Sequence, residues 1–207
     1  ALRRDLPFLP KTEITLEVNP EDVQADTLSA YRNLGVNRIS LGIQSLNQRE
    51  LAFLGRRHSV SQARRALEYV MEAGFQSVSV DLIYGLPGQE FRCWMETLKS
   101  VTGCGPHHIS CYELTAHSHT PLGRRVAAGR TRLPGENQIA AFFLGTAQRL
   151  EEEGFVHYEV SNFARSGHES RHNRKYWRRV PYLGLGPGAH SFLHPTRWWN
   201  PPCLETW

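Results

Sequence analysis

Four successive apolar runs of the sequence each contain, near their ends, a side chain able to bind a small polar ligand. These are Glu17 in TLEVNP, Gln44 in LGIQSL, Asp81 in SVDLIYG, and Tyr112 with Glu113 in SCYELT. An ionised carboxylate is costly inside an apolar run unless something pairs with it. In parallel barrels the carboxyl ends of the strands form one shared mouth, where ligand-contacting groups lie. The set therefore indicates a ligand site, although any one member alone is as compatible with the solvent face of an ordinary strand.

The elements that must position these residues alternate short apolar runs with longer stretches of helical period. Strands are predicted around 13–18, 37–46, 77–84 and 107–115, and helices over 20–34, 59–73, 90–101 and 136–153, followed by the apolar segment 155–163. A strand–helix unit repeated in this way predicts an α/β fold with a parallel sheet and right-handed crossovers. Both an α/β barrel and an open sheet satisfy this pattern.

Local signals mark the ends of the predicted helices. Asn19 is expected to cap the first helix, with Pro20 at its first position. Ser59 and Gln62 have the spacing of a capping box. Three helices end at a glycine, which suits the left-handed residue that closes a helix. These glycines are Gly35, Gly74 and Gly154.

Composition limits the classes of protein that the chain can represent. It has 207 residues, 40% of them hydrophobic, with a mean hydropathy of −0.44. This size can bury a substantial core, and no apolar run has membrane-spanning length. The net charge of +4 is mild. Because aromatic residues are not interleaved with the arginine-rich segments, we expect solvated helix faces there and no nucleic-acid partner.

The beginning of the chain and its cysteines indicate a cellular compartment. ALRRDLPFLPKTE lacks an initiator Met and a long apolar stretch, so it does not read as a secretory signal but as a chain entered partway. The cysteines show no recurrent metal or disulfide spacing, which predicts free thiols in a reducing compartment. They are Cys93, Cys104, Cys111 and Cys203.

Several segments in order resemble one known family. LEVNP, GVNRISLGIQSL, LGRRHS, VDLIYGLPGQ, ISCYELT, YEVSNFAR, HNRKYW and YLGLGPGAHS follow each other as in HemW-type haem chaperones. These are radical S-adenosylmethionine (SAM) proteins related to oxygen-independent coproporphyrinogen III oxidase. The resemblance extends from about Thr12 to the end of the chain. It implies a partial (β/α)6 barrel, represented here by about four strands and a C-terminal extension, that holds SAM and a four-iron four-sulfur cluster.

The resemblance also assigns the SAM contacts to Glu17, Gln44, Arg56 and Asp81. This set suits the chemistry of SAM, which carries an ammonium, a carboxylate, a ribose diol and a sulfonium. Glu17 suits the ammonium, and Arg56 suits the carboxylate through bidentate charge-assisted bonds. Gln44 and Asp81 can accept hydrogen bonds from the ribose hydroxyls. The individual pairings are less defined than membership of the set.

The sequence departs from the family where the cluster is held. No CxxxCxxC loop is present, and neither is the Gly-rich loop that lines the SAM site. Both lie upstream of LEVNP in the family, so we expect truncation to account for both and place no metal ligand in this chain. A relative that has lost its cluster is the less economical explanation. The family's C-terminal domain is also missing after Trp207.

Two further segments resemble functional motifs but lack the features that these motifs require. HESRH, at 168–172, matches the H-E-x-x-H pattern of zinc proteases but lacks the apolar helical context and a third ligand. GLGPG, at 184–188, lacks the spacing of a phosphate loop and is interpreted as a turn-rich segment.

HNRKYW resembles the family's HNxxYW element, associated with haem handling. His172 would ligate haem iron there, with Tyr176 and Trp177 against the macrocycle, while an ordinary loop histidine fits the residues equally well.

These observations predict a radical SAM core over 1–165 and a family-specific extension over 166–207. The predicted function is that of a radical SAM haem chaperone, which binds SAM and haem and delivers haem to acceptor apoproteins. The alternative is an oxygen-independent coproporphyrinogen III oxidase, so whether the protein is an enzyme stays open. SAM and the cluster are the expected cofactors and haem is the cargo. We expect a cytoplasmic location, or a mitochondrial one in a eukaryote, and no integral membrane segment.

Overall fold

The computed structural model describes residues 8–206, and its central element is a six-stranded sheet in the order β1-β2-β3-β4-β6-β5. The four parallel strands are β1 (Thr15–Val18), β2 (Arg38–Gln44), β3 (Ser77–Tyr84) and β4 (His108–Glu113). The predicted α/β fold with a parallel sheet is therefore confirmed. Two short antiparallel strands, β6 (Asn162–Ala164) and β5 (Val156–His157), extend the sheet beyond β4.

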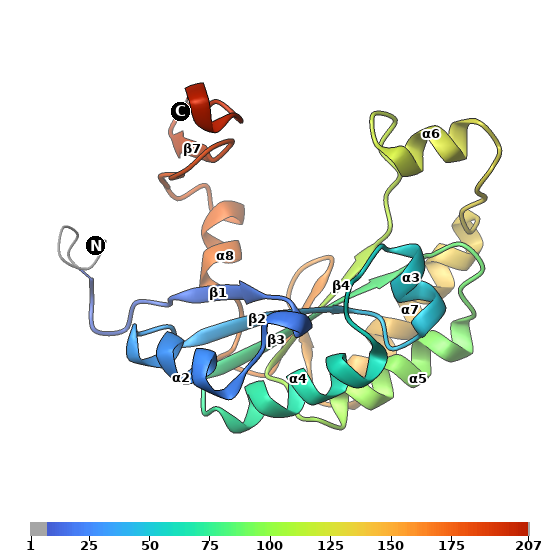
Figure 1. Ribbon diagram of the computed structural model, residues 1–207, viewed down its shortest axis with the longest axis horizontal. Helices are drawn as coiled ribbons and strands as arrows, with labels where there is room; N and C mark the ends of the chain where they lie inside the picture. The colour runs from blue at the N-terminus through green and yellow to red at the C-terminus, as the bar shows by residue number, and fades with distance from the viewer. Residues whose placement is uncertain (1–7, 207) are drawn as a thin grey trace. The chain divides into compact units, whose positions relative to one another are not determined.

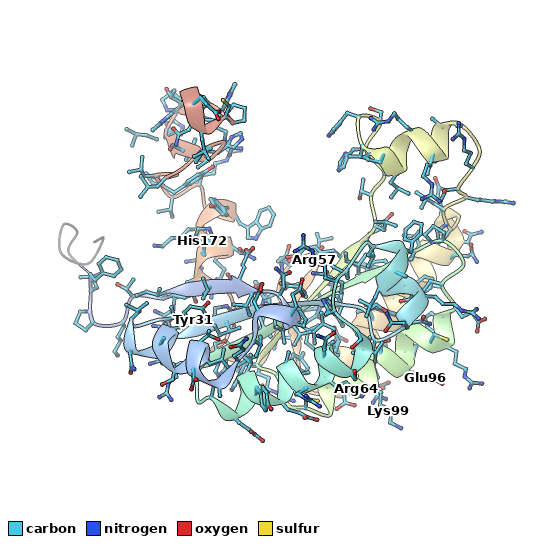
Figure 2. The ribbon with its side chains drawn as sticks, in the orientation of Figure 1. Tyr31, Arg57, Arg64, Glu96, Lys99 and His172 are labelled. Atoms are coloured by element: carbon cyan, nitrogen blue, oxygen red, sulfur yellow. The ribbon has the colours of Figure 1, made fainter. Side chains whose placement is uncertain are left out.

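Helices follow the parallel strands of the sheet. They are α2 (Ala25–Asn33), α3 (Gln48–Phe53), α4 (Val60–Glu72), α5 (Phe91–Thr102), α6 (Pro121–Ala127) and α7 (Glu136–Glu152). Buried residues of α2, α4, α5 and α7 join the apolar core on one face of the sheet. In Figure 1, α2, α4 and α5 lie side by side beneath the strands that they connect. Their outer surfaces carry charged side chains such as Arg64, Glu96 and Lys99, which point away from the sheet (Figure 2). No helix within residues 8–206 is both long and apolar enough to cross a membrane.

The core lies between this face of the sheet and the helices. Val78, Val80 and Leu82 of β3 are at most 1% exposed and belong to one buried apolar cluster with Trp94 and Leu98 of α5. Because successive side chains of a strand point to opposite faces, the residues between them face the other way. The helix-covered face of β3 is therefore apolar, and the opposite face carries Ser77, Ser79 and Asp81.

Most of the predicted helix boundaries are confirmed. The Ser59 hydroxyl accepts a hydrogen bond from the Gln62 amide (3.2 Å), and the Gln62 side chain accepts one from the Ser59 amide (2.8 Å). Gly35, Gly74 and Gly154 follow their helices with φ of 89°, 74° and 82°. Left-handed backbone of this kind is open to glycine without steric cost, so the three helices end where the sequence predicts.

The start of the first helix was predicted wrongly. Asn19 precedes only a short 3₁₀ turn, η1 (Pro20–Asp22), and its side chain makes no capping hydrogen bond; α2 begins later, after Gln24. The side-chain oxygen of Asn19 instead accepts a hydrogen bond from Arg56 (3.2 Å). The guanidinium of Arg56, distant in the sequence, thus occupies the side-chain oxygen of Asn19 that a helix cap would have used.

The chain divides into two compact units, residues 1–169 and 170–207. The second contains α8 (Arg171–Trp177), the antiparallel strands β7 (His190–Leu193) and β8 (Thr196–Trp199), and the 3₁₀ turn η2 (Leu204–Thr206). An isolated bridge pairs Tyr182 with Phe192 through two 2.9 Å backbone hydrogen bonds. The unit is therefore held by backbone pairing and aromatic contacts within its own 38-residue span.

The packing of α5 predicts how strongly the helical layer supports the sheet. Leu98 is fully buried, whereas Leu144 on α7 is 65% exposed. Leu98→Ala should lower the free energy of unfolding by about 2–5 kcal/mol, since it removes apolar contacts and leaves a cavity. Leu144→Ala is the control and should stay within about 0.5 kcal/mol of the parent. Urea unfolding followed by circular dichroism measures both, and equal losses would contradict the proposed arrangement of the core.

Candidate functional site

The sheet face opposite the helices is lined by polar side chains. Arg38 and Ser40 lie on β2, Ser77, Ser79 and Asp81 on β3, and His108 and Ser110 on β4, each at alternate positions. The register places Ser40, Ser79 and His108 opposite one another, and Asp81 opposite Ser110. Three neighbouring strands thus present continuous polar rows on one face.

Asp81 is held within this polar face by serine hydroxyls. The Ser40 hydroxyl donates a hydrogen bond to its carboxylate (2.9 Å), and Ser110 donates another. Burial raises the pKa of the Asp81 carboxyl, and the nearby carboxylate of Glu17 acts in the same direction. The two serine bonds and the charge of Arg38 oppose this shift of the pKa without cancelling it. Asp81 is therefore a carboxylate whose charge is only partly compensated by its protein neighbours.

A second polar chain runs from β3 through β4 to the loop that follows β5. His108 is 1% exposed, and its two ring nitrogens lie 2.7 Å from the Ser79 hydroxyl and 2.8 Å from the Tyr158 hydroxyl. Burial lowers the pKa of His108 to about 3, and the charge of Arg38 adds to this effect. The imidazole is therefore neutral at physiological pH and joins two hydroxyl groups across the sheet.

Gln44 and Arg56 meet around the end of β2. Gln44 is 8% exposed and has a φ of 67°, a left-handed conformation that is uncommon for residues other than glycine. A Cβ on Gly42 would lie 2.9 Å from the Gln44 amide nitrogen and 3.6 Å from the Asn19 side-chain oxygen. Asn19 in turn accepts the hydrogen bond from Arg56. Gly42 therefore leaves the room in which Gln44, Asn19 and Arg56 come together.

The four SAM contacts expected from the sequence fall into two groups in the structure. Glu17 and Asp81 lie on the polar face, where the β1–β2 register sets Glu17 beside Ser40, the hydrogen-bond donor to Asp81. Gln44 and Arg56 form the second group with Asn19. Between them the groups supply two carboxylates, an amide and a guanidinium. This donor and acceptor set fits a small ligand with ammonium, carboxylate and hydroxyl groups.

Next to Arg56, the imidazole of His58 is tied down by two hydrogen bonds. It is 1% exposed, and its ring nitrogens contact the Glu21 carboxylate (3.0 Å) and the Ile43 carbonyl (3.1 Å). Hydrogen bonds and the charges of His58 and Arg56 lower the pKa of Glu21 despite its partial burial. This contact fixes the segment after α3 to η1 and thereby holds Arg56 beside Asn19.

Sequence reasoning missed several residues of this polar face. Ser40, His108 and Ser110 each form hydrogen bonds with a buried polar group, yet none stands at the carboxyl end of its strand, where ligand contacts were predicted. Their signal is the alternation of polar and apolar residues within RISLGIQ, SVSVD and HISCY. A period of two with polar residues on one face indicates a sheet whose second face is built around polar groups.

The residues present do not fit an iron–sulfur cluster. All four cysteines are free, and they differ in environment: Cys111 is buried, Cys93 half-buried, and Cys104 and Cys203 exposed. Within residues 8–206, no three His, Cys, Asp or Glu side chains gather in a way that could hold a metal ion. Burial raises the pKa of the Cys111 thiol, which disfavours the thiolate that a metal requires.

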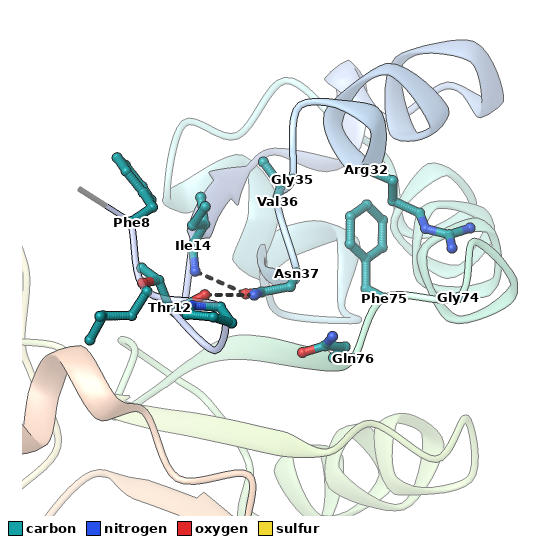
Figure 3. Close-up of a pocket in the computed structure, with 12 residues that line it drawn as sticks. Phe8, Thr12, Ile14, Arg32, Gly35, Val36, Asn37, Gly74, Phe75 and Gln76 are labelled. Carbon is teal, nitrogen blue, oxygen red and sulfur yellow. Dashed lines mark hydrogen bonds between the residues drawn. The ribbon is translucent and has the colours of Figure 1, made fainter. Parts of the chain in front are cut away.

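Two hollows lie beside the sheet, at opposite ends of its strands. The hollow in Figure 3 is lined by residues that precede β1, β2 and β3, including Ile14, Asn37 and Phe75. Asn37 closes it by accepting a hydrogen bond from the Ile14 amide (2.9 Å) and donating one to the Thr12 carbonyl (2.8 Å). In a parallel barrel this amino-terminal end serves stability rather than ligand binding. The other hollow lies beside α3 and the turn after β3, at the ligand-binding end.

The second unit places two of its three expected haem contacts together. His172 and Tyr176, one helical turn apart on α8, have ring centroids separated by 4.6 Å, and Tyr176 lies 4.5 Å from the ring of Tyr182. Figure 2 labels His172 on this helix. Trp177 is 65% exposed, and it lies about 100° further around the helix than Tyr176. His172, Tyr176 and Tyr182 thus form a row of edge-to-face rings, with Trp177 beside it.

The H-E-x-x-H pattern does not form the arrangement of a zinc protease. Helix α8 begins only at Arg171, after its N-cap Ser170, so His168 precedes the helix on which His172 lies. The ring of His168 packs against His107, with centroids 4.4 Å apart. Burial and nearby positive charge lower the pKa of both imidazoles. The two histidines of the pattern therefore do not share one helical face.

Comparison with known proteins connects this geometry to a family. The family model described as the radical SAM superfamily matches residues 1–101. A protein of Synechocystis sp. named heme chaperone HemW is 37% identical over 214 residues, covering 100% of this chain and 52% of the relative. A Danio rerio protein named radical S-adenosyl methionine domain-containing protein 1, mitochondrial, is 42% identical over 88% of this chain and 41% of its own length. The chain thus spans about half the length of these curated relatives.

A solved structure supports the same relationship. Coproporphyrinogen III oxidase (HemN) from Escherichia coli, described as a radical SAM enzyme, superposes with a TM-score of 0.81 and 25% sequence identity. The match covers 99% of this chain and 50% of the oxidase chain. The chain, with its mainly parallel sheet, therefore has the fold of the half of the oxidase that it matches.

The partly compensated charge of Asp81 predicts a stability effect that depends on pH. Because burial raises the pKa of Asp81, its ionised form opposes folding above that pKa. Asp81→Asn keeps the shape and the hydrogen bond from Ser40, so it should raise the free energy of unfolding at neutral pH. The gain should shrink as the pH falls toward the ordinary aspartate value of about 4. Urea unfolding at a series of pH values measures this, and a gain that grew toward low pH would contradict it.

Proposed function

The chain belongs to the radical SAM superfamily, and from this premise we propose that the protein is a haem chaperone that binds SAM and haem and delivers haem to acceptor apoproteins. The observation that carries the proposal is 37% identity with a HemW protein in a match that covers the whole chain and therefore spans the HNRKYW segment. The chain covers only part of such relatives, so the activity proposed is that of the complete protein.

We propose that SAM binds at the polar face of the sheet, through Glu17 and Asp81, and at the adjoining end of β2, through Gln44 and Arg56. The raised pKa of Asp81 supports this role, because a ligand that donates hydrogen bonds to the carboxylate would stabilise its charged form. The serine bonds hold that carboxylate in place for such a ligand. Arg56, oriented by Asn19, presents its guanidinium to a carboxylate such as the one SAM carries.

The four-iron four-sulfur cluster belongs to the proposal as a cofactor of the complete protein. Its ligands would be cysteines of a CxxxCxxC loop outside residues 1–207, since the cysteines within the chain do not fit a cluster. When bound, such a cluster supplies electrons to SAM. We further propose that residues 1–165 form the radical SAM core and 166–207 a family-specific extension. We also propose that the complete protein is located in the cytoplasm, or in the mitochondrion of a eukaryote.

Haem is the proposed cargo, and α8 is its proposed contact. The imidazole of His172 is a suitable axial ligand for haem iron. Tyr176 and the exposed Trp177 supply aromatic surface for the macrocycle. The cationic side chains of the same segment, among them Lys175 and Arg178, suit the two propionates through charge-assisted bonds.

A second candidate function rests on the structural match to coproporphyrinogen III oxidase. Such an enzyme would abstract hydrogen from a porphyrinogen side chain and decarboxylate it oxidatively. The two functions are separated by supplying the full-length protein with coproporphyrinogen III, reductant and SAM. Formation of protoporphyrinogen would support the oxidase and count against the chaperone.

The proposed SAM site predicts different effects for two adjacent arginines. Arg56→Ala in the full-length, cluster-loaded protein should weaken SAM binding about 30-fold, the loss of about 2 kcal/mol expected for a hydrogen bond to a charged group. Arg57→Ala is the matched control, since Arg57 is exposed and carries the same charge (Figure 2). Equilibrium dialysis with labelled SAM measures both affinities. Equal affinities of the two variants would remove Arg56 from the site.

The proposed haem contact predicts a spectral change specific to one histidine. His172→Ala in the full-length protein should weaken haem binding by about tenfold, the equivalent of about 1.4 kcal/mol, and shift the Soret band, because the axial nitrogen is lost. SAM affinity should stay unchanged, since its proposed contacts lie in the other unit.

His190→Ala serves as the control, because this exposed histidine of the same unit lies outside the HNxxYW element. A haem titration monitored by absorption compares the three proteins. An unchanged titration for His172→Ala would assign His172 to an ordinary structural role.

A further inference from the structure

We propose that Gln89 and Glu50 are positioning residues that lock the loop after β2, which begins next to Gln44, to the turn after β3, the strand that carries Asp81. The inference rests on the proposed SAM site, whose two groups of contacts come from different strands. Neither Gln89 nor Glu50 belongs to the expected contact set. They meet beside the hollow next to α3, which both residues line.

Glu50 anchors the loop after β2. Its carboxylate oxygen Oε2 accepts a hydrogen bond of 2.5 Å from the hydroxyl of Ser45, the residue that directly follows Gln44. The same hydroxyl accepts a hydrogen bond from the amide of Asn47 (3.0 Å), which caps α3. Ser45 is 1% exposed. The backbone on the carboxyl side of Gln44 is therefore fixed by a partly buried, charge-assisted bond.

Gln89 anchors the turn after β3. Its side-chain oxygen accepts a hydrogen bond from the amide of Gly85 (2.8 Å), four residues beyond Asp81. Its amide nitrogen donates a hydrogen bond to Oε2 of Glu50 (3.0 Å). With 9% exposure, Gln89 has little access to water that could replace these partners. One carboxylate oxygen thus joins the loop after β2 to the turn after β3.

The conformation of Gln44 explains why such a lock is needed. A non-glycine residue with φ of 67° stores backbone strain of about 1 kcal/mol or more, and it persists only where its surroundings hold it. The bond from Ser45 to Glu50 holds the residue next to Gln44, and Gln89 extends that restraint to the strand of Asp81. The lock therefore sets the spacing between the amide of Gln44 and the carboxylate of Asp81.

An exchange of the two side chains tests the lock. Gln89→Glu places two carboxylates at hydrogen-bond distance and should weaken SAM binding by the full-length, cluster-loaded protein about tenfold. The double variant Glu50→Gln with Gln89→Glu restores a donor and an acceptor. Placed where Oε2 of Glu50 lies, the amide nitrogen at position 50 can donate one hydrogen to the carboxylate at position 89 and the other to the hydroxyl of Ser45, and the carboxylate still accepts from Gly85. The SAM affinity of the double variant should return to within about threefold of the parent affinity. This corresponds to a difference of about 0.7 kcal/mol in binding free energy.

Thr146→Val is the control for general destabilisation. Thr146 is buried between α7 and α5, where its hydroxyl accepts a hydrogen bond from the Trp94 indole (2.7 Å), away from the strand ends. This variant should lower the melting temperature and leave SAM affinity unchanged. Glu50→Ala, which removes the shared acceptor without creating repulsion, is the second variant if Gln89→Glu does not fold, and it should also weaken SAM binding.

The outcomes separate the lock from the SAM site itself. A parent protein that does not bind SAM in equilibrium dialysis overturns the proposed function, and the lock with it. A parent that binds SAM, together with Gln89→Glu and Glu50→Ala variants of parental affinity, overturns the lock alone. A double variant as weak as Gln89→Glu, or an equal loss of affinity in Thr146→Val, also overturns it.

Discussion

The free-energy cost of placing the Asp81 carboxylate inside a sheet governs the rest of this structure. One face of β3 is committed to the apolar core, so the carboxylate must lie on the other. Burial there raises its pKa, and serines from both neighbouring strands donate hydrogen bonds to it. In the adjacent row, the buried and neutral His108 is likewise hydrogen-bonded on both sides, to the hydroxyls of Ser79 and Tyr158. The polar face is thus built so that Asp81 and His108 each have hydrogen-bond partners within the protein.

Much of this architecture follows from local sequence signals. The four parallel strands, the longer helices that follow them, the capping box at Ser59 and the glycines after the helices were predicted correctly, because each depends on residues a few positions apart. The short helices α3 and α6 were not predicted. The cap at Asn19 was predicted wrongly, since Arg56, 37 residues away, takes its side-chain oxygen. The partners of Asp81 come from other strands, 41 residues away in the case of Ser40. Such contacts depend on strand register, which short-range patterns do not specify.

The same residues that give the site its chemistry lower the stability of the chain. Asp81 is a partly compensated charge, and Gln44 has a strained backbone. Apolar packing between β3 and the helices provides the stability against which these two local costs are set. A close network of hydrogen bonds surrounds both residues, with Ser40 at one and Ser45 at the other. Strain and buried charge concentrated in this way are typical of sites whose geometry is selected for binding rather than for stability.

The left-handed backbone of Gln44 also shapes how this position can change over evolutionary time. Glycine relieves the strain without disturbing the fold, so a substitution to glycine is the one most easily accepted once selection for the amide ends. Asparagine tolerates the same φ and retains an amide, whereas β-branched residues are excluded by their shape. For the proposed SAM site, position 44 is therefore where selection for an amide acts against a local backbone cost. Once that selection ends, glycine is the residue that removes the cost while the scaffold stays intact.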